Sequence, residues 1–330
     1  MTESDVTESV TESDVTESVT TSEATESVTP KLTGVIPPVC TPMTPDRQVD
    51  AASLIRLIDH LLEGGVDGLF VLGSSSEVAY LPDAQRRVVL DTVVGHVGGR
   101  VPVLAGVIDM TTPRVLEHVR VAVEAGVSGL VATAPFYTRT HPTEIRTHFR
   151  TISAESGLPV YAYDLPVAVH TKLTAELLLG LAAEGVLAGV KDSSGDDGGL
   201  RQVILGREAP FSVLTGSEVT VDSALWMGAD GVVPGLGNVD PHGYVRLYQA
   251  ARRGDWEAAR LEQERLVRLF EIVTVGGDRM GGSSSGLGAF KAALHLRGVI
   301  DHPATALPQV PLNDEETGRI GKLLATAGLL

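Results

Sequence analysis

Short apolar runs alternate with longer amphipathic segments along the chain from Leu32 onward. In the longer segments apolar residues recur at spacings of three and four, as in Leu54, Leu57 and Leu61, which is typical of a helix with one buried face. Strands that alternate with helices indicate a parallel sheet. The short runs predict eight strands, at 35–40, 68–72, 101–106, 129–133, 160–163, 187–191, 212–215 and 231–234.

Capping residues mark the expected helix boundaries. Asp50 is predicted to cap the first helix, and Thr112 is predicted to cap a helix that starts at Pro113. A unit of two glycines separated by two residues recurs before strands, at 65–68, 126–129 and 228–231, with a looser copy at 185–189. We expect the first glycine of each unit to end a helix in the left-handed conformation. The second is expected where a strand starts beneath a packed helix.

Eight strand–helix units predict a (β/α)8 TIM barrel, an α/β fold of about 250 residues. A doubly wound open sheet is the alternative, but it usually carries a G-x-G-x-x-G turn after an early strand, and no such turn follows a strand here. Three further helices are predicted at 255–275, 286–297 and 314–328. The expected organisation is therefore a barrel at 31–254 and a C-terminal helical extension at 255–330.

Residues 1–30 differ from the rest of the chain in composition. They hold eight acidic side chains and no basic one, which is half of the formal net charge of −16, and TESDVTESV occurs at 2–10 and again at 11–19. So few apolar residues cannot offset the entropy lost when a backbone is ordered. We expect a disordered acidic tail, with a solvated spacer as its simplest role and solubility or weak docking as others.

Charge and hydropathy exclude several classes of protein. The acidic balance argues against nucleic acid as a partner, because that function requires clustered lysine and arginine. No apolar run is long enough to span a membrane, and the single cysteine, Cys40, has no partner for a disulfide within the chain. The expectation is a cytoplasmic protein that binds a small molecule.

Candidate chemistry lies where the barrel strands end, because enzymes of this fold act at the carboxyl ends of their strands. Lys191 is one of five lysines and ends the apolar run Val186-Leu-Ala-Gly-Val190. If it points into the barrel, Val190 points toward the helices and Gly189 leaves space below the amine. Burial disfavours the charged ammonium and favours the amine that forms a Schiff base with a ketone. The alternative is a structural ion pair of Lys191 with Asp164 or Asp192.

Two neighbouring strand ends supply further candidates. Tyr163 ends the preceding strand at a comparable height, so its phenol is placed to carry protons to and from a reacting oxygen. The alternative for Tyr163 is an amphipathic core residue. Gly73, Ser74 and Ser75 offer backbone N–H groups and hydroxyls suited to a carboxylate, although a serine-rich turn is often only a turn.

The order of these motifs resembles the dihydrodipicolinate synthase and N-acetylneuraminate lyase family of Schiff-base aldolases. The motifs are G-S-S-S-E, P-F-Y, Y-D-L-P, V-K-D-S-S-G, T-G-S-E and G-A-D-G-V-V-P-G. Their spacing agrees as well as their residue types, with 26 residues from Tyr137 to Tyr163 and 28 from Tyr163 to Lys191. The resemblance extends over residues 32–330.

The resemblance implies a role for each matching residue. Lys191 would form an imine with pyruvate, and Tyr163 would relay protons. Ser74 would take part in that relay, and Ser75 would bind the pyruvate carboxylate. Tyr137 would complete the relay of a neighbouring subunit, which implies a homo-oligomer, most simply a dimer of dimers.

The same resemblance implies the surroundings of the reacting atoms. The backbone carbonyl of Val233 would lie near the imine, and Gly216 with Ser217 would meet the rest of the substrate. No organic cofactor or metal is implied, and the sequence shows no cluster of His, Cys and carboxylate residues at metal-ligand spacing.

One position departs from the family's lysine-pathway synthases. Those enzymes carry an arginine two residues beyond the proline of the Y-x-x-P motif, where it binds the carboxylate of the aldehyde, and Ala168 stands at that position here. His170 is a candidate to contact the acceptor instead. The favoured interpretation is an aldolase or lyase that makes or breaks a C–C bond between pyruvate and an aldehyde. A 2-keto-3-deoxy acid dehydratase, a synthase-type condensation and a non-catalytic barrel that binds a keto acid are the alternatives.

Overall fold

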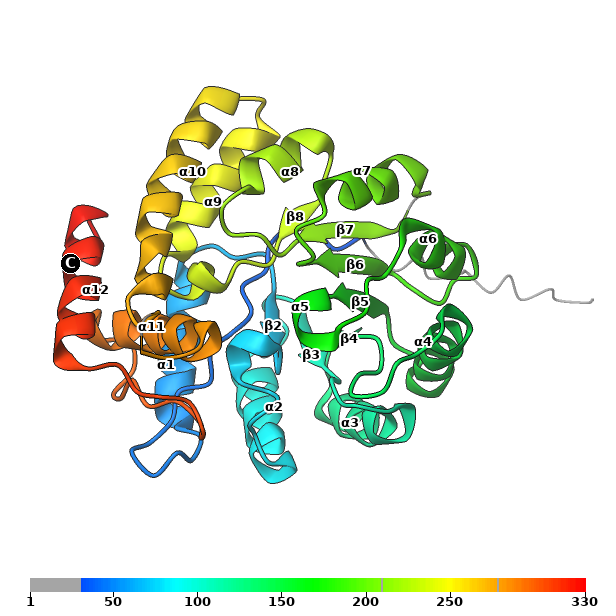
Figure 1. Ribbon diagram of the computed structural model, residues 1–330, viewed down its shortest axis with the longest axis horizontal. Coiled ribbons are helices and arrows are strands. Elements are labelled where there is room, and N and C mark those ends of the chain that lie inside the picture. Colours follow the sequence, from blue (N-terminus) through cyan, green and yellow to red (C-terminus); the bar gives the residue numbers. More distant parts are fainter. Residues whose placement is uncertain (1–30, 209, 278) are drawn as a thin grey trace, which may run out of the picture.

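Eight parallel strands form one curled sheet in the computed structural model, which describes residues 31–208, 210–277 and 279–330. The acidic tail expected at 1–30 lies outside the described residues. The sheet runs in the order β1-β8-β7-β6-β5-β4-β3-β2 with helices around its outer face, which confirms the predicted (β/α)8 barrel (Figure 1). The strands are β1 Gly34–Val35, β2 Leu69–Val71, β3 Val103–Gly106, β4 Gly129–Ala132, β5 Val160–Asp164, β6 Gly189–Asp192, β7 Ser212–Thr215 and β8 Gly231–Val232.

The barrel closes between its first two strands through irregular backbone. The expected strand at 35–40 is wrong beyond Val35, because Pro37 and Pro38 lack the N–H groups that a ladder needs. Closure is made by single contacts instead: Phe70 N donates to Pro37 O at 3.0 Å, and Val39 N donates to Phe70 O at 2.8 Å.

The helices begin and end close to the expected positions. Asp50 caps the first helix as predicted, since its carboxylate accepts from Ser53 N at 3.0 Å. Thr112 is not a cap: the helix already begins at Thr112, and its hydroxyl lies 2.9 Å from Nδ1 of His148. The barrel helices are α1 Ala51–Glu63, η1 Ser74–Ser76, α2 Asp83–Val97, α3 Thr112–Ala125, α4 Pro142–Ser156, α5 Pro166–Val169, α6 Ala175–Ala183, α7 Asp197–Gly206, α8 Val221–Met227, η2 Gly235–Asn238 and α9 Pro241–Arg252.

The two glycines of the repeated unit are required for different reasons. Gly65, Gly126 and Gly228 have φ values of +79°, +82° and +107°, which confirms the left-handed helix ends. The expectation for the second glycine is wrong at Gly231: a Cβ there would lie 2.2 Å from Gly34 O, so the neighbouring strand requires a glycine at this point, rather than a helix above it.

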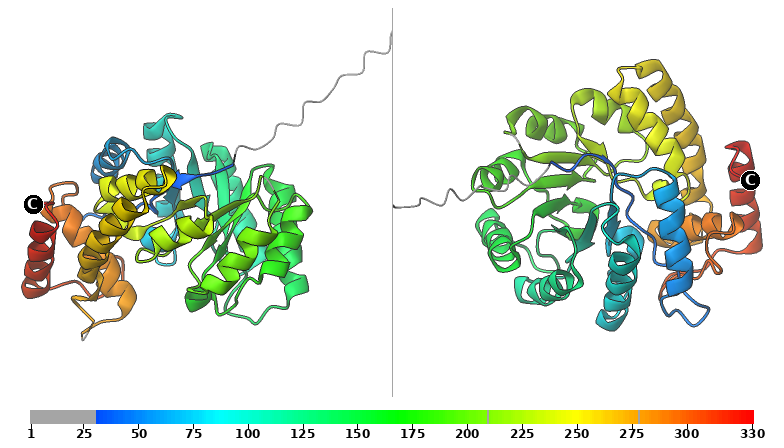
Figure 2. Two further views of the ribbon diagram at one scale, coloured as in Figure 1. Left: turned by 90° about the horizontal axis from the view of Figure 1, so that it is seen from above. Right: turned by 180° about the vertical axis from the view of Figure 1, so that it is seen from behind.

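The predicted C-terminal helices are present as α10 Trp256–Phe270 with η3 Glu271–Thr274, α11 Gly282–Leu296 and α12 Asp314–Thr326. The orange α11 and the red α12 lie at one end of the molecule, away from the green barrel helices (Figure 2). The proposed boundary at residue 254 falls between α9 and α10. Within the described ranges, none of the helices combines the length and apolar character of a membrane span.

The core has two layers that strand alternation separates. On β2, for example, Val71 packs outward against the helices, whereas the preceding residue, Phe70, points into the barrel. The inner layer consists of Leu32, Ile36, Phe70, Leu104, Val131, Tyr161, Tyr163, Leu214 and Val233. Because this layer fills the barrel, reactive groups are accessible only at its ends.

Candidate active site

Lys191 lies on β6 and points into the barrel. Val190 before it belongs to the outer core, and Gly189 faces inward, because a Cβ there would lie 2.9 Å from the Tyr161 ring. Tyr163 is the direct partner of Lys191 across the β5–β6 ladder, which places the two side chains at one height. The predicted orientation of the strand is confirmed.

Aromatic rings form the immediate surroundings of the Lys191 amine. Its side chain is 5% exposed, and Nζ lies 4.1 Å from the centroid of the Tyr163 ring and 5.0 Å from that of Phe70. The two rings meet edge to face at an interplanar angle of 86°. No carboxylate of the described residues lies within ion-pair distance of Nζ.

Lys172 accounts for the two carboxylates that were the alternative partners of Lys191. It forms an ion pair with Asp164 and lies 3.8 Å from Asp192, which excludes the structural ion pair as the role of Lys191. Burial raises the pKa of Asp164 above its ordinary value, although Lys172 acts in the opposite direction. Lys172 was not among the candidates from the sequence, since nothing in the sequence links it to residues 8 and 20 positions away.

The serine-rich turn faces Tyr163 from the end of β2. Ser74 Oγ lies 3.5 Å from Tyr163 Oη, at the limit of a hydrogen bond. The backbone N–H groups of Ser74 and Ser75 find no acceptor among the described residues, whereas Gly73 N donates to Ser76 Oγ at 3.3 Å. Ser76 is fully buried and donates to Val39 O at 2.5 Å. Two serines are therefore available to a ligand, and the third holds the turn.

A pocket of about 380 Å³ opens beside Lys191, at the carboxyl ends of β6 and β7. Gly216, in the wall of the pocket, lets the backbone approach the Lys191 side chain closely. A Cβ at this position would lie 3.1 Å from Lys191 Cε and 1.9 Å from Ser193 Oγ. The lining residues are Asp192, Ser193, Gly195, Asp196, Asp197, Leu200, Thr215, Gly216, Ser217, Glu218, Val219 and Thr220. Four carboxylates make this lining acidic.

Glu218 is the residue of the pocket that sequence reasoning missed. It stands in the T-G-S-E motif, so the signal was present, but only Gly216 and Ser217 were selected from it. Its carboxylate accepts from Gly235 N at 2.9 Å. Desolvation raises the pKa of Glu218, while the positive charge of Lys191 acts to lower it.

The remaining sequence candidates occupy three different environments. Val233 is buried in the inner layer with Tyr163. Ala168 lies on α5 and His170 directly follows this helix, and both residues are exposed. The His170 side chain makes no hydrogen bond to a described residue. Tyr137 is 90% exposed with φ of +75° and makes no hydrogen bond to Ser74 or Tyr163.

Comparison with protein families identifies one match. The model of the dihydrodipicolinate synthetase family matches residues 31–327. A Halobacterium salinarum protein described as an uncharacterized DapA-like lyase is 35% identical over 299 residues, which cover 91% of this chain and 95% of the relative. The 4-hydroxy-tetrahydrodipicolinate synthase of Kineococcus radiotolerans is 32% identical over 295 residues, 89% of this chain and 93% of that enzyme.

Solved structures give the same result for the fold. YagE of Escherichia coli K12, a prophage protein of the dihydrodipicolinic acid synthase family crystallised with pyruvate, has a TM-score of 0.83 and 29% identity. The match covers 91% of this chain and 99% of YagE. A protein described as a monomeric dihydrodipicolinate synthase variant also has a TM-score of 0.83, with 25% identity over 91% of this chain and 98% of its own.

Proposed function

The chain belongs to the dihydrodipicolinate synthetase family of lyases, and from this premise we propose that it is a Schiff-base aldolase acting on a 2-keto acid derived from pyruvate. The observation that carries the proposal is the buried amine of Lys191, which has aromatic neighbours and no ion pair among the described residues. A pyruvate complex of a family member with the same fold supports pyruvate as the unit held there.

The proposed covalent step begins at Lys191. Its neutral amine adds to the C2 carbonyl of the keto acid to give a carbinolamine. A proton taken from water then allows the hydroxyl to leave as water, which gives a protonated imine. The N–H groups and hydroxyls of Ser74 and Ser75 hold the substrate carboxylate in this step. The protonated imine then withdraws electrons from the adjacent C3–C4 bond.

Tyr163 is proposed to move the proton that cleavage requires. It removes the proton of the C4 hydroxyl, the C4–O bond becomes a carbonyl, and the electron pair of the C3–C4 bond passes into an enamine. Ser74, 3.5 Å from the phenol, passes this proton on, and Tyr137 of a neighbouring subunit completes the relay. Protonation of the enamine at C3 and hydrolysis of the imine release pyruvate and the free amine, and condensation is the reverse.

The second product is proposed to be an aldehyde without a distal carboxylate. Ala168 offers no bidentate partner for such a group. The pocket beside Lys191 carries Asp196 and Asp197, whose charges repel an anion. Neutral, aromatic or hydroxylated aldehydes are therefore preferred over aspartate semialdehyde.

A product assay tests this function. The purified protein is incubated with a panel of 4-hydroxy-2-keto acids and 2-keto-3-deoxy acids, and released pyruvate is measured enzymatically while the carbon chain is followed by mass spectrometry. We expect pyruvate and an aldehyde in equal amounts, and none with Lys191→Ala. Loss of water from an intact carbon chain would identify a dehydratase, and binding without turnover of any substrate would identify a non-catalytic barrel.

A further inference from the structure

Gln263 is a buried polar side chain of the C-terminal extension that contacts the wall of the pocket. It lies on α10 and is 4% exposed. Its Nε2 donates to Glu218 O at 3.0 Å, and its Oε1 accepts from Val221 N at 2.8 Å and Asp222 N at 3.3 Å. These partners fix the orientation of the amide, since a carbonyl needs a donor and an N–H needs an acceptor.

The contact with Val221 replaces a missing helix cap. The helix α8 begins at Val221, and the first N–H groups of any helix lack an acceptor within it. Thr220 stands at the cap position without bonding to the helix, because its hydroxyl donates to Ser217 Oγ at 2.9 Å. Gln263 therefore supplies from another helix the acceptor that the local sequence does not provide.

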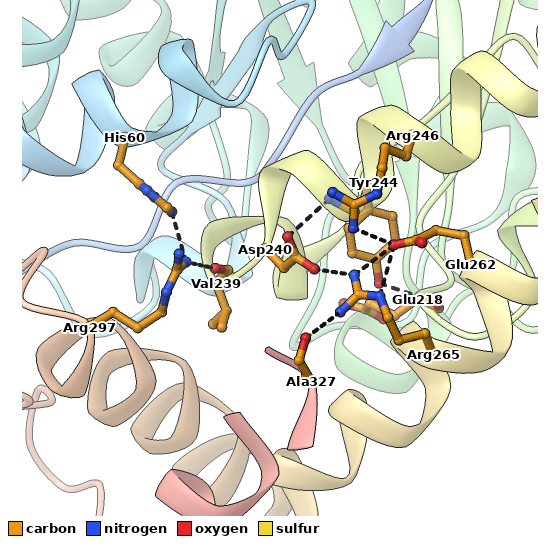
Figure 3. A network of polar contacts seen from close by, with 11 residues as sticks. His60, Glu218, Val239, Asp240, Tyr244, Arg246, Glu262, Arg265, Arg297 and Ala327 are labelled. Carbon is orange, nitrogen blue, oxygen red and sulfur yellow. Dashed lines mark hydrogen bonds and ion pairs between the residues drawn. The ribbon is translucent and has the colours of Figure 1, made fainter. Parts of the chain in front are cut away.

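Glu218 is held from two further directions. Tyr244 Oη of α9 donates to the same carbonyl, Glu218 O, at 3.2 Å (Figure 3). Gly235 N donates to the Glu218 carboxylate at 2.9 Å. Figure 3 also shows how α10 itself is fixed: Arg265 pairs with Asp240 and reaches Ala327 O at 3.4 Å. The position of the loop 215–220 thus depends on Gln263 of the C-terminal extension together with Tyr244 and Gly235 of the barrel.

This loop lies directly against Lys191, through the close approach of Gly216 to Lys191 Cε. Lys191 itself is held by the ladder of β6 with β5 and β7, which Gln263 does not touch. Loss of Gln263 is therefore expected to displace the wall of the pocket while leaving the amine in place.

We infer that Gln263 is a positioning residue that holds the loop 215–220 where the acceptor half of the substrate binds. The inference rests on the proposed function, because that function puts the keto-acid half at Lys191 and the acceptor half in the pocket. If Gln263 has this role, its loss affects the two steps differently: formation of the imine with pyruvate stays intact, whereas C–C bond formation or cleavage is lost.

The test compares these two steps in Gln263→Met, which keeps the length of the side chain and removes its hydrogen bonds. The first readout is the rate at which borohydride traps pyruvate on Lys191, and the second is kcat/KM for the best substrate of the panel. We expect trapping within about twofold of the native protein and kcat/KM lower by about ten- to a hundredfold, the effect of a misplaced binding group. Gln263→Glu, which turns a carboxylate oxygen toward Glu218 O, should show the same split.

Leu266→Val is the matched control, because Leu266 is fully buried on the same helix and has no polar side-chain atom that could bond to the loop. It should leave both readouts near the native values. A native kcat/KM in Gln263→Met, or equal loss of trapping and turnover, would overturn the inference. If Gln263→Met does not fold, Tyr244→Phe decides by the same split, since it removes the other donor to Glu218 O.

Failure of the proposed function gives a different result, in which pyruvate is not trapped on the native protein. Positioning is then measured by amide hydrogen exchange at Val221 and Asp222. Faster exchange there in Gln263→Met than in Leu266→Val supports the inference, and equal exchange overturns it.

Discussion

The phenol of Tyr163 can be separated from its ring by a single substitution. The ring packs against Phe70 and Lys191, and the hydroxyl contacts Ser74. Tyr163→Phe should therefore keep the melting temperature of the native protein and lose about 10²- to 10⁴-fold in kcat, the usual contribution of acid–base catalysis. Steady-state kinetics with thermal melts measure both. Retention of half the native kcat would remove Tyr163 from the proton path.

Ala168 makes a prediction about charge in the acceptor. The native protein should prefer an uncharged aldehyde to aspartate semialdehyde by about tenfold or more, because an unpaired carboxylate loses 1–3 kcal/mol of binding. Ala168→Arg should reduce this difference by about tenfold through a charge-assisted pair, and Ala168→Gln is the control of similar polarity without charge. The measurement is kcat/KM across the panel. A native preference for aspartate semialdehyde would show that another basic residue, with Arg139 as a candidate, supplies the charge.

At the scale of elements, His148 joins α4 to the start of α3 and the end of β4. Its Nδ1 lies 2.9 Å from the Thr112 hydroxyl, and its Nε2 lies 3.2 Å from Thr133 O, so the neutral ring donates to the carbonyl and accepts from the hydroxyl. Burial lowers the pKa of His148 from 6.5 to about 4. As the pH falls, His148 is therefore protonated in the unfolded chain before it is protonated in the folded protein. The free energy of unfolding decreases as the pH falls from about 6.5 toward 4.

Urea unfolding at pH 7 and pH 5 measures this effect. His148 should account for about 2 kcal/mol of the stability lost between these values, an order-of-magnitude figure from the two pKa values. His148→Gln, which offers a donor and an acceptor but does not titrate, should reduce the loss by that amount. An unchanged difference between the two pH values in the variant would show that the ring is not held neutral.

Local patterns predicted elements well and contacts between elements poorly. The capping role of Asp50 follows from residues within three positions of it. By contrast, no local pattern indicates the role of Lys291, which is 1% exposed and forms a buried ion pair with Glu77. Glu77 lies 214 positions earlier, directly after the serine turn. Gln263 and Lys172 are of the same kind: each acts through a partner that only the closed fold brings near.

At the scale of the whole molecule, the exposed ring of Tyr137 bears on assembly. A tyrosine that is 90% exposed and has φ of +75° is costly in isolation, and the proposed relay assigns it to a neighbouring subunit. We predict a homo-oligomer, most simply a dimer of dimers, although one solved relative is described as monomeric. Light scattering coupled to size exclusion measures the mass, and a fully active particle near 34.7 kDa would refute the prediction.

The same experiment includes the N-terminal repeat. Deletion of residues 1–30 should leave assembly and kcat unchanged, because the barrel, its closure and the pocket are all built from residues after Lys31. Loss of assembly or activity in this variant would give the repeat a structural role.

Repetition across the whole molecule also explains why the fold was easier to predict than the identity of the acceptor aldehyde. Eight strand–helix units indicate the barrel independently of one another, so the wrong predictions at Pro37 and Thr112 did not affect the predicted fold. The proposed preference for the acceptor depends on single residues, Glu218 in the pocket and Ala168 on α5, for which no repetition exists. Identity of the aldehyde therefore rests on measurement of the reaction.

The central claim, that Lys191 is the nucleophile, is tested most directly by reductive trapping. The protein is incubated with pyruvate and sodium borohydride, digested and mapped by mass spectrometry. The account predicts one reduced pyruvyl group, confined to the peptide that contains Lys191 and absent from Lys191→Ala. An unmodified native protein, or label spread over exposed lysines such as Lys322, would contradict it.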